Sequence, residues 1–366
     1  MKKLSISFLV IMLVMVVGFN TQASDITAKA FGTGGAYTGL SDDATAMLYN
    51  PAGLSDSGFL GLQFEFGMGA SDISKINDLM EDIEYFQEEF DTSSPQSAEE
   101  LFNDFPVVDV DNQLFAGGNF SSFGVGLNID NEFTTEKTSP DVINAFNTAN
   151  TSGILSISRK LKTDYNEILG MSYGVNVKTL RTDYLNVELD KANYTNTIIS
   201  ASGSGVGLDA GVMVNFTSKL KIGASFKNIV APDYELEGEK EVYEYDTGNE
   251  EWNKTSSNTY TNTYIPEQSY RVGASLDIPV ANATLLGDIE NFTTSGRTVT
   301  HLGVEKRLLF NGLSVRGGMS SPSDQDTMYT LGLGYNLAAF HFDMALGSND
   351  GFDNNLNGIL SLNFQF

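Results

Sequence analysis

The chain has 366 residues, of which 47 are acidic and 21 are Lys or Arg, giving a formal net charge of −26. It contains no Cys and only 2 His, which excludes a disulfide framework, thiol catalysis and a Cys-rich or His-rich metal site. The acidic excess opposes binding to nucleic acid, which requires a basic surface. With 36 Gly, 24 Phe and 15 Tyr, the composition favours strands and tight turns over helices. We therefore expect no nucleic-acid partner, no metal and no cofactor.

Residues 1–23 have the pattern of a secretory signal peptide. A short basic start precedes an apolar run over residues 4–19, and Thr21-Gln22-Ala23 then offers a cleavage site. The run is short for a membrane helix, although a retained anchor is the alternative. No later segment is apolar for long enough to cross a bilayer as a helix. The sequence therefore predicts an exported protein that enters the cell outer membrane, if it enters a membrane, as strands.

Residues 24–58 lack the alternation of a strand and are rich in small residues. Two short motifs stand out in this segment: Gly34, Gly35 and Ala36, and then Asn50, Pro51 and Ala52. Gly and Asn-Pro favour tight turns and close backbone approach, so we expect a compact N-terminal plug. Alternatively, Asn50-Pro51 only turns the chain into the first strand. Gly32-Thr33-Gly34 lacks the glycine spacing and the strand–helix–strand context of a dinucleotide site.

From residue 59 onward, large apolar residues alternate with small or polar ones. Clear examples are 270–278, 340–346 and 360–366. Such segments predict about fourteen strands of roughly ten residues, the length of a tilted strand that crosses a bilayer. The expected strands lie near 59–69, 112–120, 122–130, 152–161, 167–181, 203–216, 219–228, 268–279, 282–290, 297–308, 312–320, 327–336, 339–347 and 357–366. Because no second set of strands is present to cover their apolar faces, residues 59–366 are expected to form a membrane barrel.

Short and long connections alternate along the chain, as in an outer-membrane barrel. The expected extracellular loops are 70–111, 131–151, 182–202 and 229–267. Apolar residues recur with a helical period in the first loop, which predicts an amphipathic helix, either a lid or a shield for loop backbone. The last loop is expected to be an acidic hairpin. The predicted fold is all-β: a 14-stranded antiparallel transmembrane β-barrel with an N-terminal lumenal plug and a helical extracellular loop.

The alternation also predicts the register of two hairpins. A turn centred on Leu337-Ala338 would place Tyr335 opposite Phe340 on the outer face. In the second hairpin, Phe120 would pair with Phe123. Both registers keep each face of the sheet chemically uniform.

A set of charged side chains is predicted to point into the barrel. The expected lumen-lining charges are Glu65, Asp209, Arg271, Asp288, Glu305, Arg307, Arg316 and Asp343. Glu305 and Arg316 should face each other across neighbouring strands. Such charges suit a wet channel, a wall that grips a polar plug, or ion pairs that only stiffen the barrel. Phe115 and Met213 also point inward and are candidate contacts for an apolar ligand.

The segment 170–174 matches the Gly-x-Ser-x-Gly pattern of hydrolases formally. That motif requires a strained turn from a strand into a helix, whereas here it lies inside a predicted strand. We therefore assign no catalytic residue and expect no enzymatic activity.

The run from Ala30 to Ser55, with its Gly34–Ala36 and Asn50–Ala52 pieces, resembles the N-terminal signature of the FadL-like outer-membrane proteins. This superfamily includes long-chain fatty acid transporters, PorV-like proteins of a secretion system and TraF-like proteins. The resemblance implies a fourteen-stranded barrel with a lumenal plug, acting as a channel for uptake of small hydrophobic molecules. The alternative is a PorV-like secretion or envelope-assembly barrel that binds protein partners. The implied partners are outer-membrane lipid and either a hydrophobic small-molecule ligand or an envelope or secreted protein.

Overall fold

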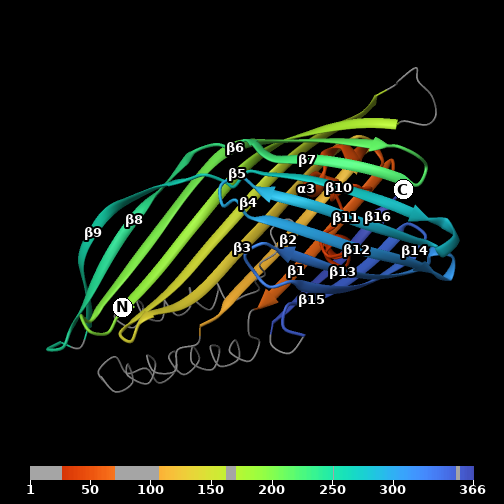
Figure 1. The fold of residues 1–366 in the computed structure, drawn as a ribbon. Coiled ribbons are helices and arrows are strands. Elements are labelled where there is room, and N and C mark those ends of the chain that lie inside the picture. The colour runs from red at the N-terminus through yellow and green to blue at the C-terminus, as the bar shows by residue number, and fades with distance from the viewer. Residues whose placement is uncertain (1–26, 71–106, 162–169, 250, 352–354) are drawn as a thin grey trace.

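The computed structural model describes residues 27–70, 107–161, 170–249, 251–351 and 355–366. Within these residues, sixteen strands form one antiparallel sheet (Figure 1). They are β1 (Leu60–Ala70), β2 (Asp109–Phe120), β3 (Phe123–Ser139), β4 (Val142–Leu161), β5 (Gly170–Asp190), β6 (Thr195–Asn215), β7 (Leu220–Val230), β8 (Tyr234–Asp246), β9 (Glu251–Tyr264), β10 (Ser269–Ile278), β11 (Ala283–Phe292), β12 (Thr298–Leu308), β13 (Leu313–Pro322), β14 (Met328–Leu337), β15 (Phe340–Ser348) and β16 (Leu356–Gln365).

Fourteen of these strands close into a ring. β5 pairs with both β4 and β6, which joins the two halves of the sheet. The remaining two strands, β8 and β9, form a hairpin, and β8 pairs with the first part of β6, from Thr195 to Ser202. The predicted fourteen-stranded antiparallel barrel is therefore confirmed. The predicted helix of segment 70–111 lies outside the described residues.

Several strands are longer than the segments of apolar alternation that predict them. β3 and β4 continue until residues 140 and 141 separate them, so the segment 131–151, expected as a loop, is mostly strand. β5 and β6 likewise pair as far as Asp190 and Thr195, so the segment 182–202 is also mostly strand. Alternation predicts a strand only as far as the apolar residues continue. Backbone pairing does not need apolar side chains, so the ladders continue past that point.

The segment 229–267, also expected as a loop, consists mainly of β8 and β9. Its turn falls between Asp246 and Glu251, as expected for an acidic hairpin. In Figure 1 this hairpin and the long parts of β3 to β6 project well beyond the ring on the side away from the short turns. The described chain thus combines a short-walled barrel with a sheet that extends from one side of its mouth.

The predicted pairing of Phe120 with Phe123 is confirmed. The predicted register of the other hairpin is wrong by two residues, because Tyr335 lies opposite Phe342 and not opposite Phe340. Its turn consists of Ala338 and Ala339, and Ala338 takes a left-handed backbone with φ 54°. A two-residue hairpin turn needs positive φ, and the sequence offers no glycine there to mark it.

The outer wall of the barrel is apolar. Leu62, Leu302, Leu331 and Leu360, from four different strands, are between 47% and 60% exposed. Glu65, which points inward from β1, is 1% exposed. Soluble monomers do not expose a continuous apolar band of this size to water. The wall is therefore that of a barrel that crosses a membrane.

Residues 27–58, called the plug below, lie inside the ring, close to the carboxyl terminus and the short turns (Figure 1). The plug contains three short helices, α2 (Ala28–Phe31), α3 (Ala46–Tyr49) and the 3-10 helix η1 (Pro51–Ser55). Among the described residues, no helix has the length and apolarity needed to cross a membrane. Between residues 27 and 54 of the plug, only three side chains are not fully buried: Lys29, Leu40 and Asp42.

Replacing Leu331 by Arg should strongly impair folding into lipid vesicles. A cation on the lipid-facing side in the middle of a strand costs about 2–4 kcal/mol. The measurement is the fraction of refolded protein that keeps heat-modifiable mobility on gels. Val280→Arg is the matched control, because Val280 lies at the tip of a short turn and is fully exposed. Equal folded fractions for the two variants would contradict a lipid-facing β14.

Candidate functional site

The wall of the barrel holds the plug through the plug's own backbone. The Asp288 carboxylate accepts hydrogen bonds from the backbone N–H groups of Tyr37 and Thr38, both at 2.9 Å. The Arg271 guanidinium donates to the carbonyl of Gly35 at 3.0 Å. Both wall side chains are about 5% exposed or less. These contacts fix the position of the chain and do not depend on which side chains the plug carries.

The start of the described plug is fixed in the same way by Glu65. Its carboxylate accepts the backbone N–H of Ala28 at 3.0 Å, as well as hydrogen bonds from Gln63 at 2.6 Å and Ser361 at 2.7 Å. No ion pair joins Glu65 to another described residue. Three donors in place of a cation make this group an anchor for the first turn of the plug.

Asn50 links the plug to itself and to the wall. Its amide donates to the carbonyl of Thr38 at 3.2 Å and to that of Val212 on β6 at 3.1 Å. Its side-chain oxygen accepts the backbone N–H of Ala52 at 3.1 Å, and Pro51 begins η1. Asn50 therefore turns the chain, as the simpler interpretation held, and also fastens the turn to the barrel.

The Gly-Gly-Ala piece passes close to the wall in a conformation that favours glycine. Gly34 and Gly35 have φ values of 68° and 85°. A Cβ added to Gly34 would lie 2.4 Å from backbone atoms of Met319. The N–H of Gly34 donates to Thr330 at 3.0 Å, and its carbonyl lies 2.8 Å from Nδ1 of His301. Ala36, next in the motif, is completely buried.

The lumen charges predicted from the sequence occur in ion pairs or in contacts with the plug. Glu305 lies opposite Arg316, as predicted, with 2.8 Å between Oε2 and Nε. Arg316 also pairs with Asp343 at 2.5 Å. Further pairs join Lys178 to Asp209 at 2.8 Å and Arg271 to Asp288 at 3.4 Å, and Arg307 contacts both Asp277 and Glu305.

Phe115 and Met213 lie inside the barrel, at 0% and 1% exposure. Phe115 belongs to an apolar cluster with side chains of the plug, including Met47 and Leu54. Next to it, a Cβ at Gly126 would contact both Phe115 and Met47. The apolar space beside the plug is thus occupied by the plug itself. Sequence analysis did not identify Met47 and Leu54, although they are large apolar residues within a segment of small ones.

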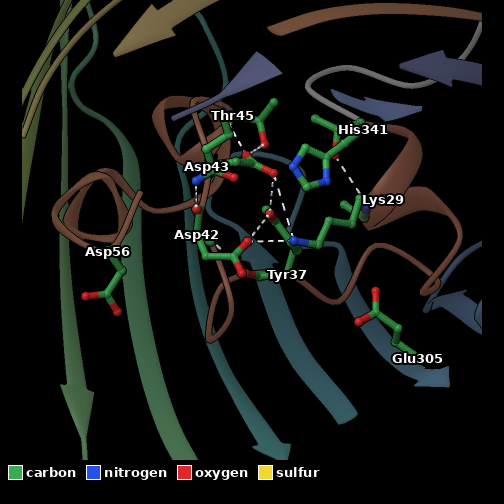
Figure 2. A network of polar contacts seen from close by, with 12 residues as sticks. Lys29, Tyr37, Asp42, Asp43, Thr45, Asp56, Glu305 and His341 are labelled. Atoms are coloured by element: carbon green, nitrogen blue, oxygen red, sulfur yellow. Dashed lines mark hydrogen bonds and ion pairs between the residues drawn. The ribbon is translucent and has the colours of Figure 1, made fainter. Parts of the chain in front are cut away.

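The plug also contains a charge network of its own, in which Tyr37 and Asp43 are buried and Lys29 and Asp42 are partly exposed (Figure 2). Lys29 lies 2.6 Å from Asp42 and 4.0 Å from Asp43. The hydroxyl oxygen of Tyr37 lies 2.9 Å from Oδ1 of Asp42 and 2.8 Å from Oδ2 of Asp43. Tyr37 has one hydroxyl proton, so it can donate to only one carboxylate. The other contact is a hydrogen bond only when one of the two carboxyl groups carries a proton.

Burial and the charges within the network act differently on the two carboxyl groups. Burial raises the pKa of Asp43, and the neighbouring Asp42 raises it further, although Lys29 acts in the opposite direction. Burial alone would raise the pKa of Asp42, but its contact with Lys29 lowers it below the usual range. Burial and the two carboxylates raise the pKa of Tyr37, so the phenol keeps its proton. Asp43 therefore holds a proton more readily than Asp42 does.

Replacing Asp43 by Asn should stabilise the plug at neutral pH. Asn keeps an oxygen for Thr45, which now donates to Asp43, and offers an N–H to Tyr37. Because the pKa of Asp43 is raised in the folded state, its contribution to stability is lost as pH rises through that pKa. Amide hydrogen exchange of the plug should therefore accelerate with pH, after correction for intrinsic rates, in the native protein and not in Asp43→Asn.

Asp42→Asn serves as the contrasting variant. It removes the partner of Lys29 and should loosen the plug by about 1 kcal/mol. A more rapidly exchanging plug in Asp43→Asn, or identical behaviour of the two variants, would show that the shared proton does not stabilise the plug.

The structure is similar to solved transporter structures over nearly its whole length. The toluene transporter TbuX of Ralstonia pickettii matches with a TM-score of 0.57 at 12% identity, covering 93% of this chain and 98% of that one. A FadL homologue of Pseudomonas aeruginosa matches with a TM-score of 0.61 at 12% identity, covering 95% and 100%. The toluene transporter TodX of P. putida matches with a TM-score of 0.55 at 12% identity, covering 93% and 98%.

Sequence comparison gives one partial match. The family model for the F plasmid transfer operon protein TraF matches residues 142–287, which run from β4 into β11. No curated protein matches the chain. The resemblance to FadL-like barrels that the N-terminal motif indicated is confirmed as a shared fold.

Proposed function

We propose that this chain is an outer-membrane channel whose plug controls the uptake of small hydrophobic molecules. The observation that carries the proposal is a closed barrel, apolar outside, whose lumen contains a segment fastened by its backbone. The shared fold with the toluene transporters TbuX and TodX supports a hydrophobic molecule as the ligand. In this proposal residues 1–23 direct export, the short turns face the periplasm and the projecting sheet lies outside the cell.

The position of the plug indicates what uptake requires. Phe115 is covered by Met47 and by the rest of the apolar cluster that includes Leu54. A hydrophobic molecule could contact Phe115 only after the plug has moved. Ligand entry therefore requires the plug to move. The wall contacts to the plug backbone set how readily the plug moves.

A second function is favoured by the sheet that projects from the mouth. β3 to β6, with β8 and β9, extend well beyond the ring (Figure 1). A channel for small molecules does not need a sheet of this length in water. A PorV-like barrel that binds secreted or envelope proteins would use it as a docking surface.

Deleting residues 31–50 should leave the barrel folded and open a larger ion-conducting path. Asp288→Ala should give a smaller effect of the same kind, because it leaves two buried N–H groups without an acceptor, at about 1–3 kcal/mol each. Conductance is measured in planar bilayers. Entry of a hydrophobic fluorescent dye into vesicles, measured on the same proteins, tests the ligand class.

The matched control for Asp288→Ala is Asp277→Ala on β10. Asp277 pairs with Arg307 and accepts a hydrogen bond from Thr284, and its side chain forms no hydrogen bond or ion pair with the described residues of the plug. Its conductance and dye entry should equal those of the native protein. If folded Asp288→Ala and the deletion both leave conductance and dye entry unchanged, the plug is not a gate and the protein-binding function is favoured.

A further inference from the structure

Among the described residues, the β8–β9 hairpin ends the sheet with an edge that no other strand covers. β9 is the last strand in the sheet order, and within the described part of the chain it pairs only with β8 on one side. A register shift at Thr255 interrupts the β8–β9 pairing, but from residue 256 to 264 the strand is regular and contains no charged residue, no Pro and no Gly, and most of its side chains are exposed. Proteins usually protect such edges with charges, Pro or bulges, because a free edge can pair with another strand.

The outer face of the hairpin carries two parallel columns of side chains. On β8 the column is acidic and consists of Glu235, Glu237, Glu239 and Glu241. On β9 the opposite residues are short hydroxyl side chains: Thr263, Thr261, Thr259 and Ser257. The inner face of the same hairpin is aromatic and packs against β5 and β6. The two columns therefore face solvent beside the free edge.

Most of the acidic column lacks a counter-charge. Glu241 pairs with Lys254, whereas Glu235, Glu237 and Glu239 form no ion pair with another described residue. Carboxylates at alternating positions of one strand repel each other, which is unfavourable unless a cation lies nearby. The described residues contain no group of three or more acidic or His side chains that could hold a metal ion. A row of separate positive charges fits this column better than a single metal ion.

We propose that the free edge of β9 binds an extended basic segment of another protein as an added β-strand. Main-chain hydrogen bonds to β9 would supply affinity, as in other cases of strand addition. Lys or Arg at every second position of the segment would match the spacing of the acidic column. The added strand lies about 10 Å from β8, two strand spacings away. Long basic side chains can span this distance because the Thr and Ser side chains between them are short.

The proposal concerns the projecting sheet and does not depend on what passes through the lumen. On the orientation proposed above, the partner is an extracellular or secreted polypeptide. The hairpin lies at the far end of the sheet from the plug (Figure 1), so changes there leave the wall contacts to the plug intact. Effects on strand binding and effects on conductance can therefore be measured separately.

The first test uses the full chain in detergent and a nine-residue peptide with alternating Lys and Thr. We expect it to bind and to slow amide hydrogen exchange in residues 255–264, whereas a matched peptide of alternating Glu and Thr should do neither. Two N-methylated versions separate strand pairing from charge attraction. Methylation at every Lys blocks one edge of the peptide, and methylation at every Thr blocks the other. One version should lose about tenfold or more in affinity and the other should bind normally.

The second test removes the acidic column. A variant with Gln at positions 235, 237 and 239 should bind the Lys-Thr peptide about tenfold more weakly while keeping native gel mobility and conductance. Glu188→Gln is the matched control, since Glu188 is an exposed acidic residue on β5 outside the hairpin. It should bind the peptide as the native protein does.

Three results would overturn the proposal. Equal binding of the two methylated peptides would indicate ion exchange at the surface. Peptide binding without slower exchange in residues 255–264 would place the site elsewhere. Concentration-dependent protection of the same residues in the peptide-free protein would show that a second copy of the chain occupies the edge.

Discussion

The plug depends on the barrel wall because it cannot satisfy its own backbone. Its helices α2, α3 and η1 are each five residues or shorter, and the backbone between and before them includes groups, such as the N–H groups of Ala28, Tyr37 and Thr38, that bond to the wall. Buried backbone groups without partners are costly. Asp288, Arg271 and Glu65 on the wall supply partners at three such places. The plug is thus ordered only as part of the barrel, which is the arrangement that a movable gate requires.

The wall is shaped for the plug as well as bonded to it. A Cβ at Gly211 would lie 2.0 Å from Oδ1 of Asn50, and one at Gly174 would lie 2.3 Å from the backbone of Pro51. A Cβ at Gly318 would lie 2.1 Å from the backbone of Gly34. The inward positions next to both plug motifs are therefore glycines, because the two backbones come within contact distance. This close fit explains how a short segment can fill the lumen at one end of the barrel.

Much of the barrel could be predicted from alternation, because each lipid-facing strand must present apolar residues on one side. The same rule places Glu305 opposite Arg316 and leaves Glu65 inside the wall. Alternation does not apply to the parts of strands that lie outside the membrane. The length of β3 to β6 and the pairing of β8 with β6 could therefore not be predicted. Alternation also does not predict which groups the buried charged side chains contact. Nothing in the sequence near Arg271 indicates that its guanidinium binds the carbonyl of Gly35, which is 236 positions away.

The most direct test of the account is amide hydrogen exchange at Tyr37 and Thr38 in the intact protein. Both N–H groups donate to Asp288 inside the lumen, so the central claim requires them to be held by the wall. The account predicts exchange far slower than in an unstructured peptide, and much faster exchange at these two positions when Asp288 is replaced by Ala. Rapid exchange at both positions in the native protein, with the strands still protected, would contradict it.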